Sequence, residues 1–477
     1  MDRKSGVLMH ISSLFGDYSI GSFGDEAKYF IDFLSDCGFT YWQVLPFCPS
    51  DKCNSPYKSP SAFAGNPYFI DLKALYDTGL LTFEELTQQK QTNQYLCEFE
   101  RLYDERLKVL FNASQRFSQK DEVIKFIESD KYLSDFCKFM AIKQKNNDLP
   151  WFEWTDESYD DKILFMWQFI EYTFFSQWNK IKEYAGSKGI KIIGDIPIYV
   201  DLDSSDVWAN KHLFKLDEKN APITVAGVPP DYFCEDGQLW GNPIYDWDEM
   251  KKEDFRWWRD RIWHMTKIFD GIRIDHFKGI ESFWEINGNE SSAKNGKMTK
   301  GPGMALINAI KEECSDALII AEDLGLITKD VEKLVSDSGF PGMRVFQFAF
   351  MGDSNSTHLP HNYTNNCIAY TGTHDNNTLL GYLWELDEHT RKTMLDYCGF
   401  KGDDWGKGLD DIIRTVMQSH AGAVIMPIQD LLGYGSDTRL NTPGKAEGNW
   451  AYRITKEQLD SIDRNYFRHL NELYSRI

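Results

Sequence analysis

Two patterns of hydrophobic and polar positions alternate along the 477 residues of the chain. Short apolar runs recur, and between them apolar residues return every three or four positions. Near-continuous apolar runs are typical of parallel strands covered on both faces, and the wider spacing is typical of amphipathic helices. The apolar runs predict eight strands, at residues 5–10, 41–47, 190–200, 270–276, 317–323, 342–350, 367–374 and 423–430.

The helical pattern is clearest in residues 25–37, where the apolar positions from Ala27 to Leu34 share one helix face and Gly38 follows as the expected C-cap. Eight strands alternating with helices favour the α/β class, as a single (β/α)8 TIM barrel that spans residues 1–477. Further helices are predicted at residues 162–188, 248–269, 302–314, 328–338, 387–397, 407–420 and 455–475.

Three connections are too long or too polar to be simple links. Residues 70–160, after the second strand, are charged and helical in pattern, which predicts a mainly helical insertion subdomain. Residues 201–247, after the third strand, are rich in Pro, Gly, Asp and aromatic residues. A loop of that length is usually functional, so we interpret it as a lid-like insertion, with a packed surface loop as the alternative. A third polar stretch, 433–449, follows the eighth strand and predicts a second long active-site loop.

Composition limits the kinds of partner and compartment that the sequence favours. The formal charge is −21, from 52 basic and 73 acidic side chains, which argues against nucleic acid or an anionic membrane as a partner. The nine cysteines are scattered without a CxxC pair, a pattern that favours a reducing compartment over a disulfide frame or a zinc site. Without a signal-peptide pattern or a long apolar stretch, the chain is predicted to be cytoplasmic. Its oligomeric state is not predicted.

Acidic residues collect where several predicted strands end. They are Asp195, Asp275, the pair Glu322 and Asp323, and Asp375. Active sites of such barrels lie at the C-terminal ends of the strands. Each acid taken alone could equally begin a loop or cap a helix, but four converging strands favour a site.

Two of these acids are suited to opposite tasks. Arg273 and Asp275 are two positions apart on one strand face, so the arginine is expected to lower the pKa of the aspartate and keep it ionised as a possible nucleophile. Glu322 follows an apolar run, and desolvation is expected to raise its pKa and suit it to act as an acid. Glycosyl transfer uses such a pair, one attacking and one protonating the leaving oxygen.

Seven stretches carry a resemblance to a known family. "GDIPIYV", "GIRIDHF", "AEDLG" and "GTHDNNT" resemble the four ordered regions of the α-amylase clan. Residues 55–72, 226–247 and 436–450 are similar to the 4-alpha-glucanotransferases called amylomaltases or disproportionating enzymes. The resemblance runs from about residue 5 to residue 453 and is weakest in 75–160.

The resemblance implies an enzyme that moves α-1,4-linked glucan segments between maltooligosaccharides by a retaining double displacement. Amylose and glycogen-derived glucans would be further substrates. Asp275 would be the nucleophile that forms a covalent glucosyl-enzyme, Glu322 the general acid and base, and Asp375 the holder of the 2- and 3-hydroxyls of the distorted sugar. The alternatives are a hydrolase of the same clan, a silent glucan-binding protein and a metal-dependent barrel enzyme.

The resemblance also implies a set of substrate-binding residues. Arg273 would orient Asp275, Asp195 would brace the site and Tyr57 would stack on the donor ring. His374 would bond a sugar hydroxyl, whereas His276 would either contact substrate or only neighbour the nucleophile. Acceptor sugars and the rest of the chain would meet the remaining four residues, Tyr232, Phe233, Trp240 and Asn441.

No metal or cofactor is expected. The stretch "DLDSSD" at 201–206 imitates the start of a calcium loop, but Asp206 stands where that loop needs glycine and His212 where it needs glutamate. No HExxH motif or spaced Cys/His cluster indicates a catalytic metal.

Overall fold

A closed barrel of eight parallel strands forms the centre of the computed structural model, which describes residues 2–50, 53–230, 235–314, 316–325, 327–445 and 447–477. The strand order around the barrel is β1-β12-β11-β10-β9-β6-β3-β2, and the predicted TIM barrel is confirmed. Its strands are β1 (Lys4–Leu8), β2 (Tyr41–Gln43), β3 (Lys191–Pro197), β6 (Gly271–Asp275), β9 (Leu318–Ala321), β10 (Gly342–Val345), β11 (Cys367–Tyr370) and β12 (Ala423–Pro427).

The strands are shorter than predicted at their C-terminal ends, and this places the acids. The predicted strand 317–323 stops at Ala321, so Glu322 already belongs to the loop. Inside the barrel, apolar side chains such as Ile193, Ile320 and Ile425 form a buried cluster. This cluster fills part of the barrel interior, and the buried Arg273 of β6 lies in register with Ile320 of the cluster.

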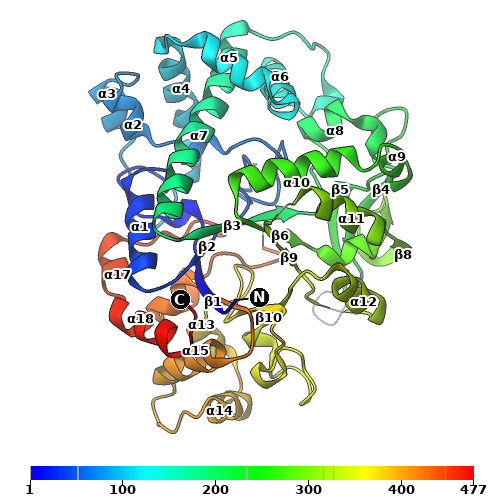
Figure 1. Cartoon of the computed structure of the whole chain (residues 1–477). Helices are drawn as coiled ribbons and strands as arrows, with labels where there is room; N and C mark the ends of the chain where they lie inside the picture. Colours follow the sequence, from blue (N-terminus) through cyan, green and yellow to red (C-terminus); the bar gives the residue numbers. More distant parts are fainter. Residues whose placement is uncertain (1, 51–52, 231–234, 315, 326, 446) are drawn as a thin grey trace.

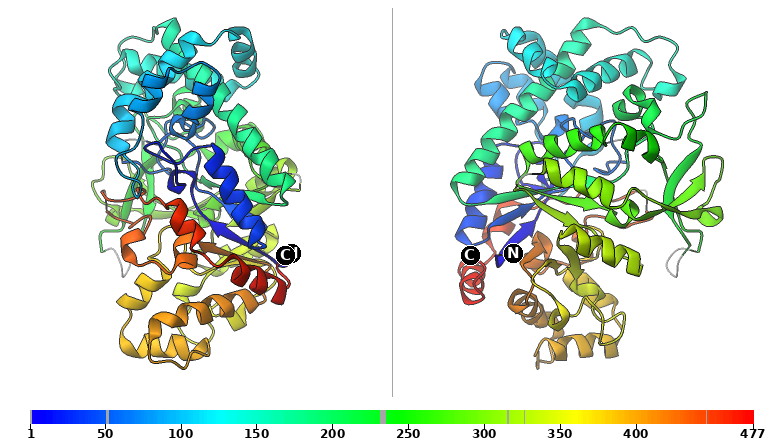
Figure 2. Two further views of the ribbon diagram at one scale, coloured as in Figure 1. Left: turned by 90° about the vertical axis from the view of Figure 1, so that its left-hand side faces the viewer. Right: turned by 45° about the vertical axis from the view of Figure 1, so that its right-hand side comes forward.

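Helices cover the outside of the barrel (Figure 1). The structure confirms the predicted helices as α1 (Asp25–Asp36), α7 (Asp161–Ser187), α11 (Met304–Glu313), α12 (Lys329–Ser338), α14 (Glu388–Tyr397) and α15 (Leu409–Gln418). The two chain ends lie close together (Figures 1 and 2), and the Nε of Arg3 donates to the carbonyl oxygen of Tyr474 at 3.0 Å. No helix in the described ranges is long and apolar enough to cross a membrane.

Two predicted helices are wrong in their continuity. Residues 248–269 form α9 (Trp247–Lys252) and α10 (Arg256–Ile268), because Asp254 and Phe255 adopt left-handed backbone with φ of 55° and 54°. The terminal segment 455–475 is likewise divided. Its two helices are α17 (Lys456–Asp460) and α18 (Arg464–Leu473), and the sequence pattern also missed α13 (Leu379–Glu385) and α16 (Ile428–Leu432).

Helices also gather at one end of the molecule, where residues 70–160 pack against α7 (Figures 1 and 2). The pattern of residues 70–160 is helical, as predicted. These helices are α2 (Leu72–Asp77), α3 (Phe83–Gln88), α4 (Phe99–Arg116), α5 (Lys120–Glu128) and α6 (Lys131–Lys145).

The segment 201–247 is more ordered than the predicted loop. It contains the short helix α8 (Ser205–Ala209) and two strands, β4 (Thr224–Val228) and β5 (Gln238–Pro243). The strand β4 pairs with residues 284–287, which come after β6, so a local sequence pattern does not predict the sheet. The four-stranded antiparallel sheet has the order β5-β4-β7-β8, with β7 (Ser282–Asn287) and β8 (Lys297–Lys300).

Candidate active site

A cleft of about 550 Å³ opens at the C-terminal end of the barrel. Loops that follow five of the barrel strands and the strand β5 contribute to its walls. Among its lining residues are Tyr57, Asp201, Trp240, Asn242, Asp275, His276, His374, Asp375, Asn441 and Trp450.

One wall is built at the ends of strands. Arg273 and Asp275 share a face of β6, and Nη2 of the arginine lies 2.8 Å from Oδ1 of Asp275. Its Nη1 donates to Oδ2 of Asp195 at 2.6 Å, because β3 pairs with β6 in the register that sets Asp195 opposite Arg273. The Nε donates to the sulfur of Met343 at 3.4 Å. The arginine is thus fixed at three points.

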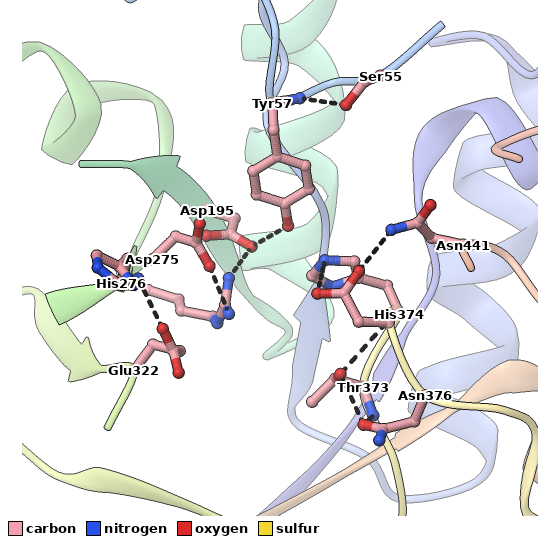
Figure 3. A network of polar contacts seen from close by, with 12 residues as sticks. Ser55, Tyr57, Asp195, Asp275, His276, Glu322, Thr373, His374, Asn376 and Asn441 are labelled. Atoms are coloured by element: carbon pink, nitrogen blue, oxygen red, sulfur yellow. Dashed lines mark hydrogen bonds and ion pairs between the residues drawn. The ribbon is translucent and has the colours of Figure 1, made fainter. Parts of the chain in front are cut away.

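Glu322 is linked to this wall through the backbone of His276. The residue follows β9, and its side chain accepts the N–H of His276 at 2.7 Å and the N–H of Leu324 at 2.8 Å. His276 has a φ of 52°, in the left-handed region. One acid is therefore bonded to the residue that directly follows the other (Figure 3). We call Asp195, Arg273, Asp275 and Glu322 the strand-end group.

Burial is the main cause of the pKa shifts of Asp275 and Glu322. It raises the pKa of Asp275 to about 7; Arg273 opposes this shift, and Asp195, Glu322 and Asp375 add to it. Burial likewise raises the pKa of Glu322, against Arg273 and the two N–H donors. The pKa expected for Glu322 is confirmed in direction, but that for Asp275 is wrong, because desolvation and three neighbouring carboxylates outweigh one arginine. The two acids interact and titrate as a pair.

The opposite wall is built on a turn after β11. Oδ1 of Asp375 accepts the Nδ2 of Asn441 at 2.6 Å, and Oδ2 lies 3.3 Å from Nε2 of His374 (Figure 3). Burial alone would raise the pKa of Asp375, but His374, Asn441 and Arg273 lower it well below its usual range. Burial lowers the pKa of His374, but the carboxylate of Asp375 outweighs it and raises that pKa. We call His374, Asp375 and Asn441 the turn group.

Aromatic rings connect and flank the two walls. Tyr57 donates to Oδ2 of Asp195 at 2.7 Å and stacks on the ring of His374, with centroids 5.1 Å apart. Trp240 of β5 meets the ring of His276 edge-on at 4.8 Å and is 37% exposed. Trp450 lies 5.9 Å from the ring of Tyr57. The cleft therefore carries flat apolar surfaces beside its carboxylates.

The structure brings together ten of the twelve predicted site residues. Tyr232 and Phe233 lie outside the described residues. The sequence pattern missed Arg439, whose Nη2 donates to the carbonyl oxygen of Asp375 and whose Nε donates to that of Asn441, both at 2.7 Å. Its position within 436–450 was the available signal. The described ranges contain no group of three or more His, Cys, Asp or Glu that could hold a metal ion.

Comparisons with known proteins agree over the whole chain. The family model described as 4-alpha-glucanotransferase matches residues 9–459. The 4-alpha-glucanotransferase of Clostridium butyricum is 43% identical over 98% of this chain and 100% of its own, and that of Thermus thermophilus is 38% identical over 100% of both chains.

Solved structures give the same picture. The amylomaltase from Streptococcus agalactiae in complex with acarbose has a TM-score of 0.95 and 38% identity, with 100% of both chains covered. The amylomaltase from Corynebacterium glutamicum, at 18% identity over 99% of this chain and 74% of its own, has a TM-score of 0.80 and supports the fold alone. By sequence and structure, the chain belongs to the 4-alpha-glucanotransferase family.

Proposed function

We propose that this chain moves α-1,4-linked glucan segments between maltooligosaccharides by a retaining double displacement through a covalent glucosyl-Asp275 intermediate. The observation that carries the mechanism is the hydrogen bond of 2.7 Å between Glu322 and the N–H of His276, next to Asp275. Retention requires two carboxyl groups about 5–5.5 Å apart, whereas inversion leaves room for a water between them. A direct link between Glu322 and the neighbour of Asp275 favours the shorter spacing.

In the first displacement, a carboxylate oxygen of Asp275 attacks C1 of the donor sugar. The bond from C1 to the leaving O4 breaks, and Glu322 gives its proton to that oxygen. The shortened chain leaves with a complete 4-hydroxyl, and the glucan segment stays on Asp275. The raised pKa of Glu322 supports this role, because the acid must hold a proton near neutral pH.

In the second displacement, the 4-hydroxyl of an acceptor sugar attacks C1. Glu322, now a carboxylate, takes the hydroxyl proton, and the bond to Asp275 breaks. Two inversions at C1 give net retention. The ion pair between Arg273 and Asp275 stabilises the carboxylate both before attack and on release.

Asp375 acts on the sugar rather than on the bond. Its depressed pKa keeps it ionised, so both oxygens can accept hydroxyl protons of the distorted ring. Hydrogen bonds to the 2-hydroxyl strengthen as the sugar approaches the transition state. Asn441 and His374 hold this carboxylate from two sides. It therefore cannot move to fit the undistorted sugar of the ground state.

Transfer rather than hydrolysis requires that a sugar reach the intermediate before water does. Trp240, exposed beside His276, offers an acceptor sugar an apolar face. That the similar amylomaltase from Streptococcus agalactiae was solved with acarbose supports an oligosaccharide as the ligand of this cleft. The role of residues 201–247 as a lid, the separate status of the insertion 70–160 and a cytoplasmic location remain our proposals.

Incubation with maltotriose tests the function. We expect a ladder of longer maltooligosaccharides together with glucose, since each transfer lengthens one chain and shortens another. Products that are only shorter than maltotriose would instead identify a hydrolase. An Asp275→Asn variant serves as the control, because it should yield neither pattern.

A further inference from the structure

The eighth predicted strand also ends in a carboxylate, Asp430, which the proposed reaction does not use. It lies in α16, just after β12, and is only 3% exposed. Its partners in the described part of the chain are two hydrogen-bond donors. Burying a carboxyl group without a neighbouring cation costs folding free energy, so the presence of Asp430 at this position calls for an explanation.

The two donors lie at the two ends of the turn that carries His374 and Asp375. Oδ2 of Asp430 accepts the hydroxyl of Thr371 at 2.6 Å, and Oδ1 accepts the N–H of Leu379 at 2.7 Å. Thr371 directly follows β11, and Leu379 is the first residue of α13. His374 and Asp375 lie between them. One carboxylate therefore bridges the entrance and the exit of the segment that carries half of the site.

The tip of the turn is held by other residues. The N–H and hydroxyl of Thr373 both donate to Oδ1 of Asn376, at 2.9 and 2.8 Å, which closes the turn on itself. From outside, Arg439 and Asn441 reach Asp375. These bonds fix the shape of the tip. The turn is also tied to Gln347, whose Nε2 donates to the carbonyl oxygen of Asn377 at 2.8 Å, whereas Asp430 contacts both the entrance and the exit of the turn.

We propose that Asp430 is a positioning residue that holds residues 371–379 so that Asp375 and His374 point into the cleft. The proposal rests on the role proposed above for Asp375. A carboxylate suits the task because it has two oxygens that accept a hydroxyl and an N–H together. Burial raises the pKa of Asp430 to about 6, against Thr371 and Leu379, which marks the group as costly to keep charged.

The first test removes the bridge with Asp430→Ala. We expect kcat for maltotriose disproportionation to fall about 10- to 100-fold, as a misplaced turn allows, while KM changes less than about threefold, since Asp375 acts mainly in the transition state. Asp430→Asn should recover most of the rate, because its oxygen accepts from Leu379 and its amide donates to the hydroxyl of Thr371. An alanine variant with unchanged kcat, or an asparagine variant as slow as alanine, would overturn the proposal.

A matched control separates positioning from stability. Asn471 is fully buried and likewise links two elements away from the cleft, since its Oδ1 accepts the hydroxyl of Ser5 in β1 and its Nδ2 donates to the carbonyl oxygen of Cys37 after α1. Asn471→Ala should lower the melting temperature and leave kcat per folded molecule within about threefold of the parent. If both alanine variants lose kcat equally, Asp430 has only a structural role.

A double-mutant cycle identifies the residue through which Asp430 acts. In an Asp375→Asn background, Asp430→Ala should cost less than about threefold, because the group it positions is already disabled. A full multiplicative loss would contradict the proposal. If Asp430→Ala does not fold, Thr371→Val removes one end of the bridge and is judged by the same cycle. If Asp375→Asn itself is as active as the parent, the proposed function fails, not the bridge.

Discussion

The two groups that flank the cleft reach their positions in different ways. The strand-end group is placed by the ladder of the barrel, since the register of β3 against β6 sets Asp195 opposite Arg273. The turn group is placed by side-chain hydrogen bonds: Asn441 and Arg439 donate to Asp375, and Asp430 accepts the N–H of Leu379 at the end of the turn. Backbone pairing between strands fixes neighbouring residues directly, whereas a turn is held by side-chain hydrogen bonds from other parts of the chain. Substitutions of residues that do not touch the sugar should therefore lower the rate more often around the turn than at the strand ends.

The two groups also differ in charge. Burial raises the pKa values of Asp275 and Glu322, so these two acids can hold and release protons near neutral pH. In the turn group, His374 and Asn441 outweigh burial and keep Asp375 ionised. In the proposed mechanism, Asp275 and Glu322 therefore make and break the bonds at C1, and Asp375 holds the distorted sugar.

The largest effect is expected at the nucleophile. Asp275→Asn should lower the transfer rate by at least about 10⁴-fold, as for other residues that form a covalent intermediate. Affinity for maltooligosaccharides should remain, because the aromatic walls and the turn group are intact. Rate assays and calorimetric titration measure the two quantities. A variant with the parental rate would remove Asp275 from the mechanism.

The second effect belongs to the acid. Glu322→Gln should lower the rate about 10²- to 10⁴-fold with ordinary maltooligosaccharides. A donor with a fluoride leaving group needs no proton, so its first step should be far less affected. Single-turnover rates of the first step with both donors check this difference. Equal losses of this first-step rate with the two donors would contradict the role of Glu322 as general acid.

The acid limb of the pH profile of kcat/KM should shift in opposite directions when Arg273 and Asp195, the two neighbours of Asp275, are replaced. As pH falls, kcat/KM should decline when Asp275 takes up a proton, and as pH rises it should decline when Glu322 loses one. Arg273 lowers the pKa of Asp275, so Arg273→Met should move the acid limb to higher pH. Asp195 raises that pKa, so Asp195→Asn should move the limb to lower pH. Shifts of the same sign in both pH profiles would contradict this electrostatic account.

The smallest effect is on stability. Because the pKa of Asp275 is higher in the folded chain than in the unfolded chain, folding favours its protonated form, and stability declines as pH rises through that range. Asp275→Asn removes this cost. The melting temperature should rise by about 1–3 °C at pH 8 and by less at pH 5. Thermal melts of the two proteins at both pH values decide, and a gain that is larger at pH 5 contradicts the assignment.

The strand-end group was the more predictable of the two. Apolar runs located β6 and β9, and the ends of these strands located Asp275 and Glu322 without a structure. The net pKa shift of Asp275 could not be predicted, because it depends on burial in the folded chain and on three carboxylates from other elements. A pairwise argument on one strand sees only Arg273.

The turn group and the sheet around the cleft were less predictable. Asn441 was identified through a family resemblance, and Arg439 and Asp430 were not identified, because their partners lie far away in the sequence. The strands β4 and β5 were predicted as loop, since β4 pairs with β7, which comes after β6. Long-range pairing leaves no local period to detect.

The most direct test of the account is to trap the intermediate. The Glu322→Gln variant would be mixed with an α-maltotriosyl fluoride donor, which still forms the covalent species but lacks the base that activates the acceptor. Peptide mass spectrometry should find one maltotriosyl unit on the peptide that contains Asp275, and none when Asp275 is replaced by Asn. A label on another residue, or turnover with inversion at C1 and no label, would contradict the double displacement.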